Sequence, residues 1–66
     1  MDYFKMKPLI GLNADIATYD NFDKACVNLS YVEAIQRAGG NAIILPPMPA
    51  EDLDTIIEKL DGLVFI

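Results

Sequence analysis

The chain has 66 residues, of which 53% are hydrophobic, and its ten acidic and five basic residues give a net charge of −5. A chain of this length forms at most one small domain and buries only about 60% of the surface that it exposes when unfolded. The hydrophobic content excludes a disordered tail, and no apolar run approaches the roughly 20 residues of a membrane span. The negative charge disfavours nucleic acid and anionic membranes as partners.

Cys26 is the only cysteine, and the chain has no histidine. An internal disulfide is therefore excluded, and a zinc ion would find a poor set of ligands. We expect neither a metal nor a cofactor. A free thiol, together with an acidic start that differs from a secretory signal, predicts a cytoplasmic protein.

The first predicted strand covers residues 8–12, a short apolar run that begins with a proline. Proline is tolerated at the first position of a strand, and Gly11 would permit the close approach of another backbone element. Asn13 and Asp15 are polar and follow at the carboxyl end of this strand. Residues 16–29 are harder to assign, but their polar, turn-rich middle predicts a surface loop.

A helix is predicted over residues 31–38, where apolar residues recur every three positions. Its start has two interpretations. Ser30 and Glu33 have the spacing of a capping box, which would make Ser30 the N-cap. Alternatively, the apolar pattern extends back to Val27, and Ser30 is an interior residue of a longer helix. The glycine pair at 39–40 ends the helix in both cases.

Residues 41–45 are predicted to form a second strand, and their continuous apolar run is typical of a strand covered by helices on both faces. Prolines 46 and 47 end this strand. A second helix is predicted over 49–60, which has the cleanest helical periodicity in the chain, and a third strand over 63–66. The order strand, helix, strand, helix, strand predicts an α/β fold with a doubly wound parallel sheet.

Asn13 and Asp15 are the candidate substrate-binding residues, because α/β proteins bind ligands at the carboxyl ends of their strands. The structural alternative is that both side chains hydrogen-bond the turn backbone. Cys26 has neither a preceding strand nor a histidine partner, so we assign it to packing and name no catalytic residue. The acidic run at 51–58 suits a helix start better than a metal site. The glycine pair at 39–40 follows a helix, so it does not form a phosphate loop.

Three segments, taken in order, carry a resemblance to a known family: KPLIGL at 7–12, YVEAIQRAGG at 31–40 with LPP at 45–47, and LDGLV at 60–64. The chain resembles the amino-terminal part of class I glutamine amidotransferase-like hydrolases. The likeness is greatest to the γ-glutamyl-γ-aminobutyrate hydrolase group, the peptidase C26 family. The middle segment is the specific part of this resemblance, which spans nearly the whole chain.

The resemblance implies a flavodoxin-like sheet and a hydrolase that cleaves γ-glutamyl amide bonds. In the family, a cysteine nucleophile acts with a histidine and an acid, and a glycine-rich segment after the third strand helps to build the oxyanion hole. None of these elements occurs in this sequence, and Cys26 does not match the position of the family's cysteine. We therefore expect residues 1–66 to be an incomplete, amino-terminal fragment of one such domain. Its expected partners are the remainder of that domain, a small γ-glutamyl substrate and a second copy in a homodimer.

Two other functions fit the same order of elements. Periplasmic-type sugar-binding domains also open with a strand, a polar loop and a helix, and their first loop commonly contacts the ligand, which would give Asn13 and Asp15 that role. The third reading is a non-catalytic interaction fragment that folds only with another chain. In each case a three-stranded sheet of this length would leave apolar strands exposed at both edges.

Overall fold

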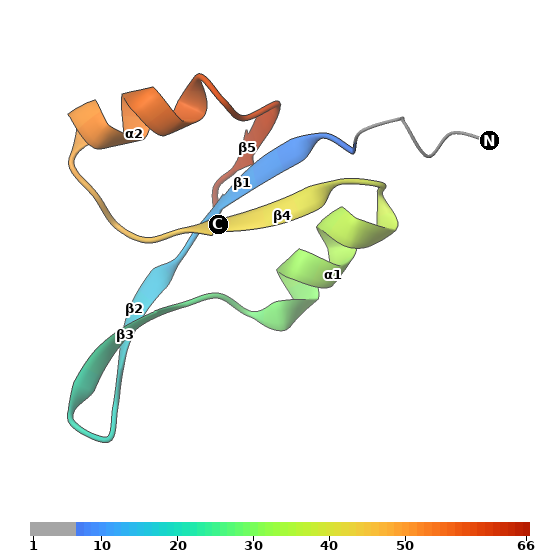
Figure 1. The fold of residues 1–66 in the computed structure, drawn as a ribbon. Coiled ribbons are helices and arrows are strands. Elements are labelled where there is room, and N and C mark those ends of the chain that lie inside the picture. The colour runs from blue at the N-terminus through green and yellow to red at the C-terminus, as the bar shows by residue number, and fades with distance from the viewer. Residues whose placement is uncertain (1–6) are drawn as a thin grey trace.

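The computed structural model describes residues 7–66 and contains a three-stranded sheet, a two-stranded hairpin and two helices (Figure 1). In chain order the elements are β1 (Leu9–Asn13), β2 (Asp15–Tyr19), β3 (Phe22–Cys26), α1 (Leu29–Arg37), β4 (Asn41–Leu45), α2 (Ala50–Ile57) and β5 (Gly62–Val64). Within the described residues, neither helix is long and apolar enough to cross a membrane.

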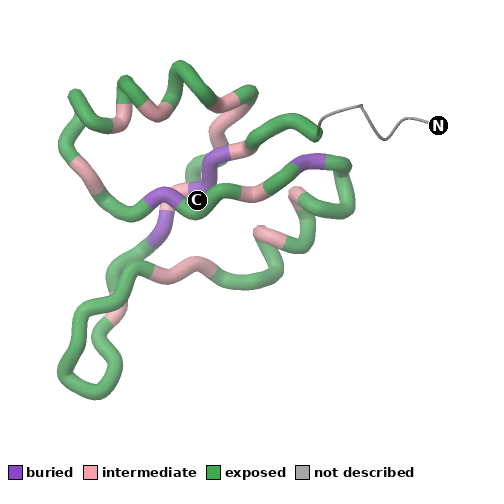
Figure 2. The backbone as a smooth tube through the Cα atoms, viewed as in Figure 1, coloured by how far each residue is buried: buried purple, intermediate pink, exposed green. Residues whose placement is uncertain are grey.

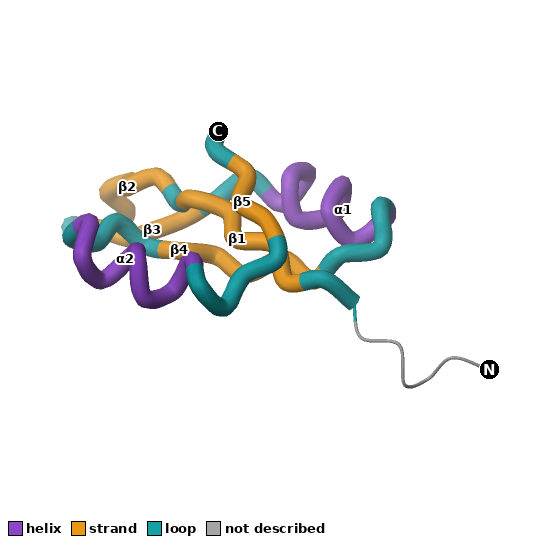
Figure 3. The backbone as a smooth tube through the Cα atoms, turned by 90° about the horizontal axis from the view of Figure 1, so that it is seen from above, coloured by secondary structure: helices purple, strands orange, loops and turns teal. Residues whose placement is uncertain are grey.

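The main sheet has the strand order β4-β1-β5, and both pairings are parallel. The chain therefore moves from β1 to one side through α1, and then returns across β1 to the other side through α2. Because crossovers in parallel sheets are right-handed, this change of direction puts the two helices on opposite faces. Figure 3 shows α1 and α2 separated by the sheet. The predicted α/β class with a doubly wound parallel sheet is confirmed.

Helix α1 begins earlier than its capping-box spacing indicates. Asn28 is the N-cap, and its Oδ1 accepts hydrogen bonds of 3.0 Å from both the backbone N–H and the hydroxyl of Ser30. Ser30 is thus an interior residue, as the second interpretation predicts, but the helix begins at Leu29 and does not extend back to Val27. At the other end, the N–H of Gly39 donates to Gln36 and the N–H of Gly40 donates to Ile35, both at 3.0 Å.

This pair of bonds is a Schellman motif, which requires a left-handed residue directly after the C-cap, here Ala38. Gly39 occupies that position with φ of +97°. The glycine pair therefore ends α1 as the sequence predicts, and the chain enters β4 one residue later.

The surface loop expected at residues 16–29 is wrong over most of its length, because residues 15–26 form an antiparallel hairpin. Strands β2 and β3 are joined through Asp20 and Asn21, both of which have positive φ. Two successive residues with positive φ make the type of turn that matches the twist of a hairpin, and Asn and Asp tolerate that conformation better than most residues. Figure 1 shows the hairpin projecting from the carboxyl end of β1, away from the main sheet.

Only three apolar residues among those described are buried, namely Leu12, Ala14 and Leu45. Figure 2 shows that most of the backbone is exposed and that only a few short stretches are buried. The radius of gyration is 13.6 Å, whereas a compact chain of this length would have one of about 11 Å. The described residues thus have a small core and a large exposed surface.

Much of that exposed surface lies on the edge strands. On β4, the neighbouring residues Ile43 and Ile44 are 39% and 47% exposed, although they point to opposite faces. Beyond β5, Phe65 is 71% exposed. One helix on each face is too little to cover three strands, so the edge strands of residues 7–66 stay exposed, as expected for a sheet of this length.

Side chains tie the ends of β5 to the central strand. At the amino end, Asp61 Oδ2 accepts from the N–H of Leu9 at 2.7 Å, and the N–H of Asp61 donates to the carbonyl of Leu9 at 2.8 Å. Gly11 is the middle residue of β1, and the atoms nearest to the position of its missing Cβ are leucine side chains and not the backbone expected from the sequence. A Cβ atom on Gly11 would lie 2.6 Å from Leu60 Cδ1.

Candidate functional site

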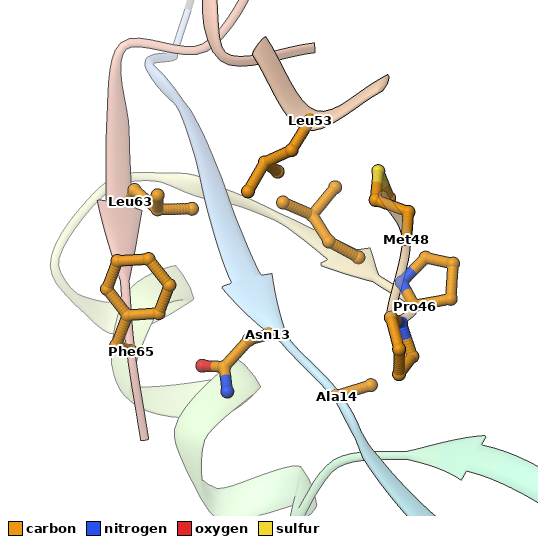
Figure 4. A pocket seen from close by; sticks show the side chains of 9 residues that line it. Asn13, Ala14, Pro46, Met48, Leu53, Leu63 and Phe65 are labelled. Carbon is orange, nitrogen blue, oxygen red and sulfur yellow. The ribbon is translucent and has the colours of Figure 1, made fainter. Parts of the chain in front are cut away.

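A cavity of about 260 Å³ opens at the carboxyl edge of the main sheet (Figure 4). Its walls come from the ends of all three strands, from the segment after β4 and from α2. The lining residues are Asn13, Ala14, Leu45, Pro46, Pro47, Met48, Leu53, Leu63 and Phe65. In an open α/β sheet this edge is the usual place for a ligand, so the cavity is the candidate site of the described chain.

The local sequence explains why a cavity forms here. Pro46 and Pro47 cannot donate to the sheet, so β4 ends at Leu45 and the chain turns away from the strands. Helix α2 then starts at Ala50, and its first turns bring Leu53 over the opening. Figure 4 shows Leu53 and Met48 on one side of the cavity and Phe65 on the other.

Asn13 lies at the rim of the cavity, at the last position of β1, as the sequence predicts. Its Oδ1 accepts from the backbone N–H of Ile66 at 2.8 Å, and its Nδ2 donates to the carbonyl of Ile66 at 3.2 Å. These bonds tie the segment after β5 to the central strand, 53 residues away along the chain. The amide keeps a second N–H that these bonds do not use, and its contact with substrate stays a prediction.

Asp15 is placed differently from the sequence interpretation. The first strand ends at Asn13, and Asp15 is instead the first residue of β2, with an exposed side chain. It is absent from the residues that line the cavity. The structure thus brings Asn13, but not Asp15, to the cavity wall, and a role for Asp15 with substrate also stays a prediction.

Cys26 is the last residue of β3 and stands opposite Asp15 in the hairpin. It is half-buried and does not line the cavity. Since the sequence contains no histidine, this thiol lacks the usual base of a cysteine nucleophile. The expectation that no strand precedes Cys26 is wrong, because β3 ends at this residue. The packing role of Cys26 stays a prediction.

Acidic side chains do not gather into a metal site within residues 7–66, where no three potential ligands from His, Cys, Asp and Glu lie close together. Glu51 and Asp52 occupy the first turn of α2, and both are exposed. That position suits carboxylates, because the amino end of a helix carries a partial positive charge.

The cavity wall consists mostly of apolar side chains, and none of the residues that line it is charged. The described site can therefore enclose an uncharged group, but it offers no nucleophile or general base. Sequence reasoning missed all the lining residues except Asn13. One usable signal was the proline pair directly after a strand, because the segments that follow parallel strands meet at one edge of the sheet.

Comparison with known proteins identifies the family. The family model described as Peptidase C26 matches residues 8–66. A glutamine amidotransferase-like protein of Rickettsia prowazekii (strain Madrid E) is 35% identical over 66 aligned positions, which cover 91% of this chain and 23% of that relative. The chain thus spans less than a quarter of the length of the curated relative that it matches. No solved structure was found to match. The family model matches almost the whole chain, and the parallel sheet with its carboxyl-edge cavity agrees with this match. The chain therefore belongs to the peptidase C26 family.

Proposed function

We propose that this chain is the amino-terminal part of a hydrolase domain that cleaves γ-glutamyl amide bonds in the cytoplasm. Membership of the peptidase C26 family and the amidotransferase-like relative support a hydrolase or amidotransferase. The specificity for γ-glutamyl amides rests on sequence resemblance. The segments around residues 7–12, 31–47 and 60–64 resemble those of the γ-glutamyl-γ-aminobutyrate hydrolase group.

The proposed reaction uses groups that residues 7–66 do not provide. A cysteine thiolate attacks the γ-carbonyl carbon and forms a tetrahedral oxyanion, which backbone N–H groups stabilise. The C–N bond then breaks, and the leaving amine takes a proton from the protonated base. Water, deprotonated by the same base, attacks the thioester, which releases glutamate and restores the thiol. In this scheme the described chain shapes one wall of the site and carries the central strand.

The family match over residues 8–66 carries the proposed activity, and the exposed apolar surface of the sheet carries the proposal that the domain is incomplete. Ile43 and Ile44 on one edge and Phe65 beside the other are large hydrophobic residues that are more than a third exposed. Edge strands with this composition promote aggregation unless another segment covers them. We propose that further polypeptide of the same domain covers both edges and supplies the nucleophile and the base.

The test is to express the complete open reading frame that contains residues 1–66, to measure the mass of the intact product, and to assay it with γ-glutamyl amides. We expect a product heavier than the 7.3 kDa of this chain that releases glutamate and is inactivated by a thiol alkylating agent. An intact 7.3 kDa product that unfolds cooperatively as a monomer would refute the incomplete-domain proposal. A heavier product that is inactive on every γ-glutamyl amide would refute the proposed substrate class.

A further inference from the structure

We infer that Asn13 is a positioning residue for the proposed reaction, because its side chain holds the backbone that leaves β5 at the place where the complete domain binds substrate. The inference rests on the proposed function, and in it Asn13 acts on the structure of the site and not on the substrate itself. It starts from two hydrogen bonds to one residue, which we call the Asn13 clamp. Asn13 Oδ1 accepts from the N–H of Ile66 at 2.8 Å, and Asn13 Nδ2 donates to the carbonyl of Ile66 at 3.2 Å.

The Asn13 clamp lies at the place in the sheet where a ligand is expected. In a doubly wound sheet whose first three parallel strands have the order 2-1-3, ligands bind outside the carboxyl ends of the first and third strands. Here those strands are β1 and β5, because the sheet order is β4-β1-β5. Asn13 is the last residue of β1, and Ile66 lies just beyond the end of β5. Figure 4 shows the Asn13 side chain pointing from β1 towards the segment that carries Phe65.

A side chain makes this connection because the backbone of β1 leaves β5 at the same point. The backbone pairing of the two strands ends at Leu12 and Val64. Beyond it, the N–H of Ala14 donates to the carbonyl of Leu45 at 3.0 Å, so the backbone after β1 follows β4. The amide of Asn13 thus supplies the donor and the acceptor that the departing backbone no longer offers to the segment after β5.

Holding both backbone groups of Ile66 also fixes the start of the next segment. In the complete domain, the carbonyl of Ile66 belongs to the peptide group that joins this residue to its successor, and a peptide group is planar. The hydrogen bond from Asn13 Nδ2 therefore orients the first peptide group beyond β5 as well as placing it. Further polypeptide would cover the exposed edges of the sheet, whereas the atoms of the clamp are already paired with each other within residues 7–66.

A second side chain holds the same pair of strands at the opposite edge of the sheet, and it provides a matched control. Asp61 Oδ2 accepts from the N–H of Leu9 at 2.7 Å, just before β5 begins. A hydrogen bond to a charged group is about as strong as two between neutral groups, so Asn13→Ala and Asp61→Ala lose similar stabilisation. The two positions differ in place, because only Asn13 lies at the edge where an α/β sheet binds its ligand.

The kinetics of both variants in the complete gene product test the inference, with γ-glutamyl-γ-aminobutyrate as the substrate and at a temperature where circular dichroism shows both to be folded. A misplacement of about 1 Å can lower a rate about 100-fold, so we expect Asn13→Ala to lower kcat about tenfold or more and to leave KM within about threefold. Asp61→Ala should leave kcat within about twofold, because the substrate binds at the opposite edge. An unchanged kcat in Asn13→Ala, equal losses of kcat in the two variants, or a rise in the KM of Asn13→Ala alone would overturn the inference.

A measurement of backbone mobility makes the result independent of hydrolysis. ¹⁵N relaxation gives order parameters for the backbone amides, which are about 0.85 in rigid backbone and below about 0.6 in flexible segments. In the complete gene product we expect the first residues after Ile66 to be rigid, and to become flexible in Asn13→Ala but not in Asp61→Ala. If they do so in a protein that hydrolyses no γ-glutamyl amide, the proposed function fails and the Asn13 clamp stands. If these residues keep their order parameters and chemical shifts in Asn13→Ala, the inference fails.

Discussion

Replacing Asn13 with alanine tests whether this residue acts mainly on the structure or on the substrate. The substitution removes two hydrogen bonds to Ile66, one of 2.8 Å from its N–H and one of 3.2 Å to its carbonyl. A protein hydrogen bond contributes about 0.5–1.5 kcal/mol net. Since water reaches both groups and replaces part of the loss, we expect the pair to stabilise the local structure by about 1–2 kcal/mol.

Amide hydrogen exchange of Ile66 in the complete gene product measures this local effect directly. A loss of about 1–2 kcal/mol corresponds to exchange that is about 5–30 times faster, because about 1.4 kcal/mol is a factor of ten. Asn13→Asp keeps an acceptor for the N–H of Ile66 but loses the donor to its carbonyl, so its exchange rate should lie between those of Asn13 and Asn13→Ala. Asn41→Ala, at the opposite edge of the sheet, is the control and should leave Ile66 unchanged.

One result would refute this reasoning. If Ile66 exchanges at the same rate in Asn13→Ala as in the unaltered protein, the two hydrogen bonds do not hold the segment after β5. A rise in KM of tenfold or more with unchanged exchange would then show that Asn13 acts on substrate. Faster exchange with an unchanged KM would assign Asn13 to the structure alone.

Three further predictions concern the fold. Gly11→Ala should destabilise the complete protein by about 1–3 kcal/mol in urea unfolding, because the new methyl group meets leucine side chains from three segments. Gly62→Ala is the control and should destabilise it less, because its Cβ would meet only the flexible tip of one isoleucine at 3.1 Å. An equal loss of stability in both variants would contradict the packing argument. Asn28→Ala should cost about 1 kcal/mol and Ser30→Ala clearly less, since Asn28 is the N-cap; the reverse order would favour the capping box. The 66-residue chain alone should show no cooperative transition in a circular dichroism melt, and a sharp two-state transition would contradict the incomplete-domain proposal.

The hairpin shows how a local signal was misread. Asp20 and Asn21 occupy the two left-handed positions of its turn, but this pair lacks the glycine that marks most two-residue hairpins. Tyr19 and Phe22, which face each other across the turn, are residues of high strand propensity. Weighting those aromatics above the polar composition would have predicted β2 and β3.

The sequence alone determined the parts of this protein that depend on neighbouring residues. The periodicity around Leu53 predicted α2, although the helix is shorter than the predicted 49–60, and the glycine pair predicted the end of α1, because these signals act within one or two helical turns. Continuous apolar runs and their order predicted the parallel, doubly wound sheet. The absence of histidine excluded the usual base for Cys26.

The tertiary structure alone decided what lies at the carboxyl edge. The pairing of Asn13 with Ile66 joins residues 53 positions apart, and the cavity collects side chains from three strands, a proline segment and a helix. No local pattern specifies such contacts, because they depend on how far each strand extends and where each connection crosses the sheet. Because β1 ends at Asn13, this residue lies at the cavity rim, whereas Asp15, two residues later, is the first residue of the hairpin.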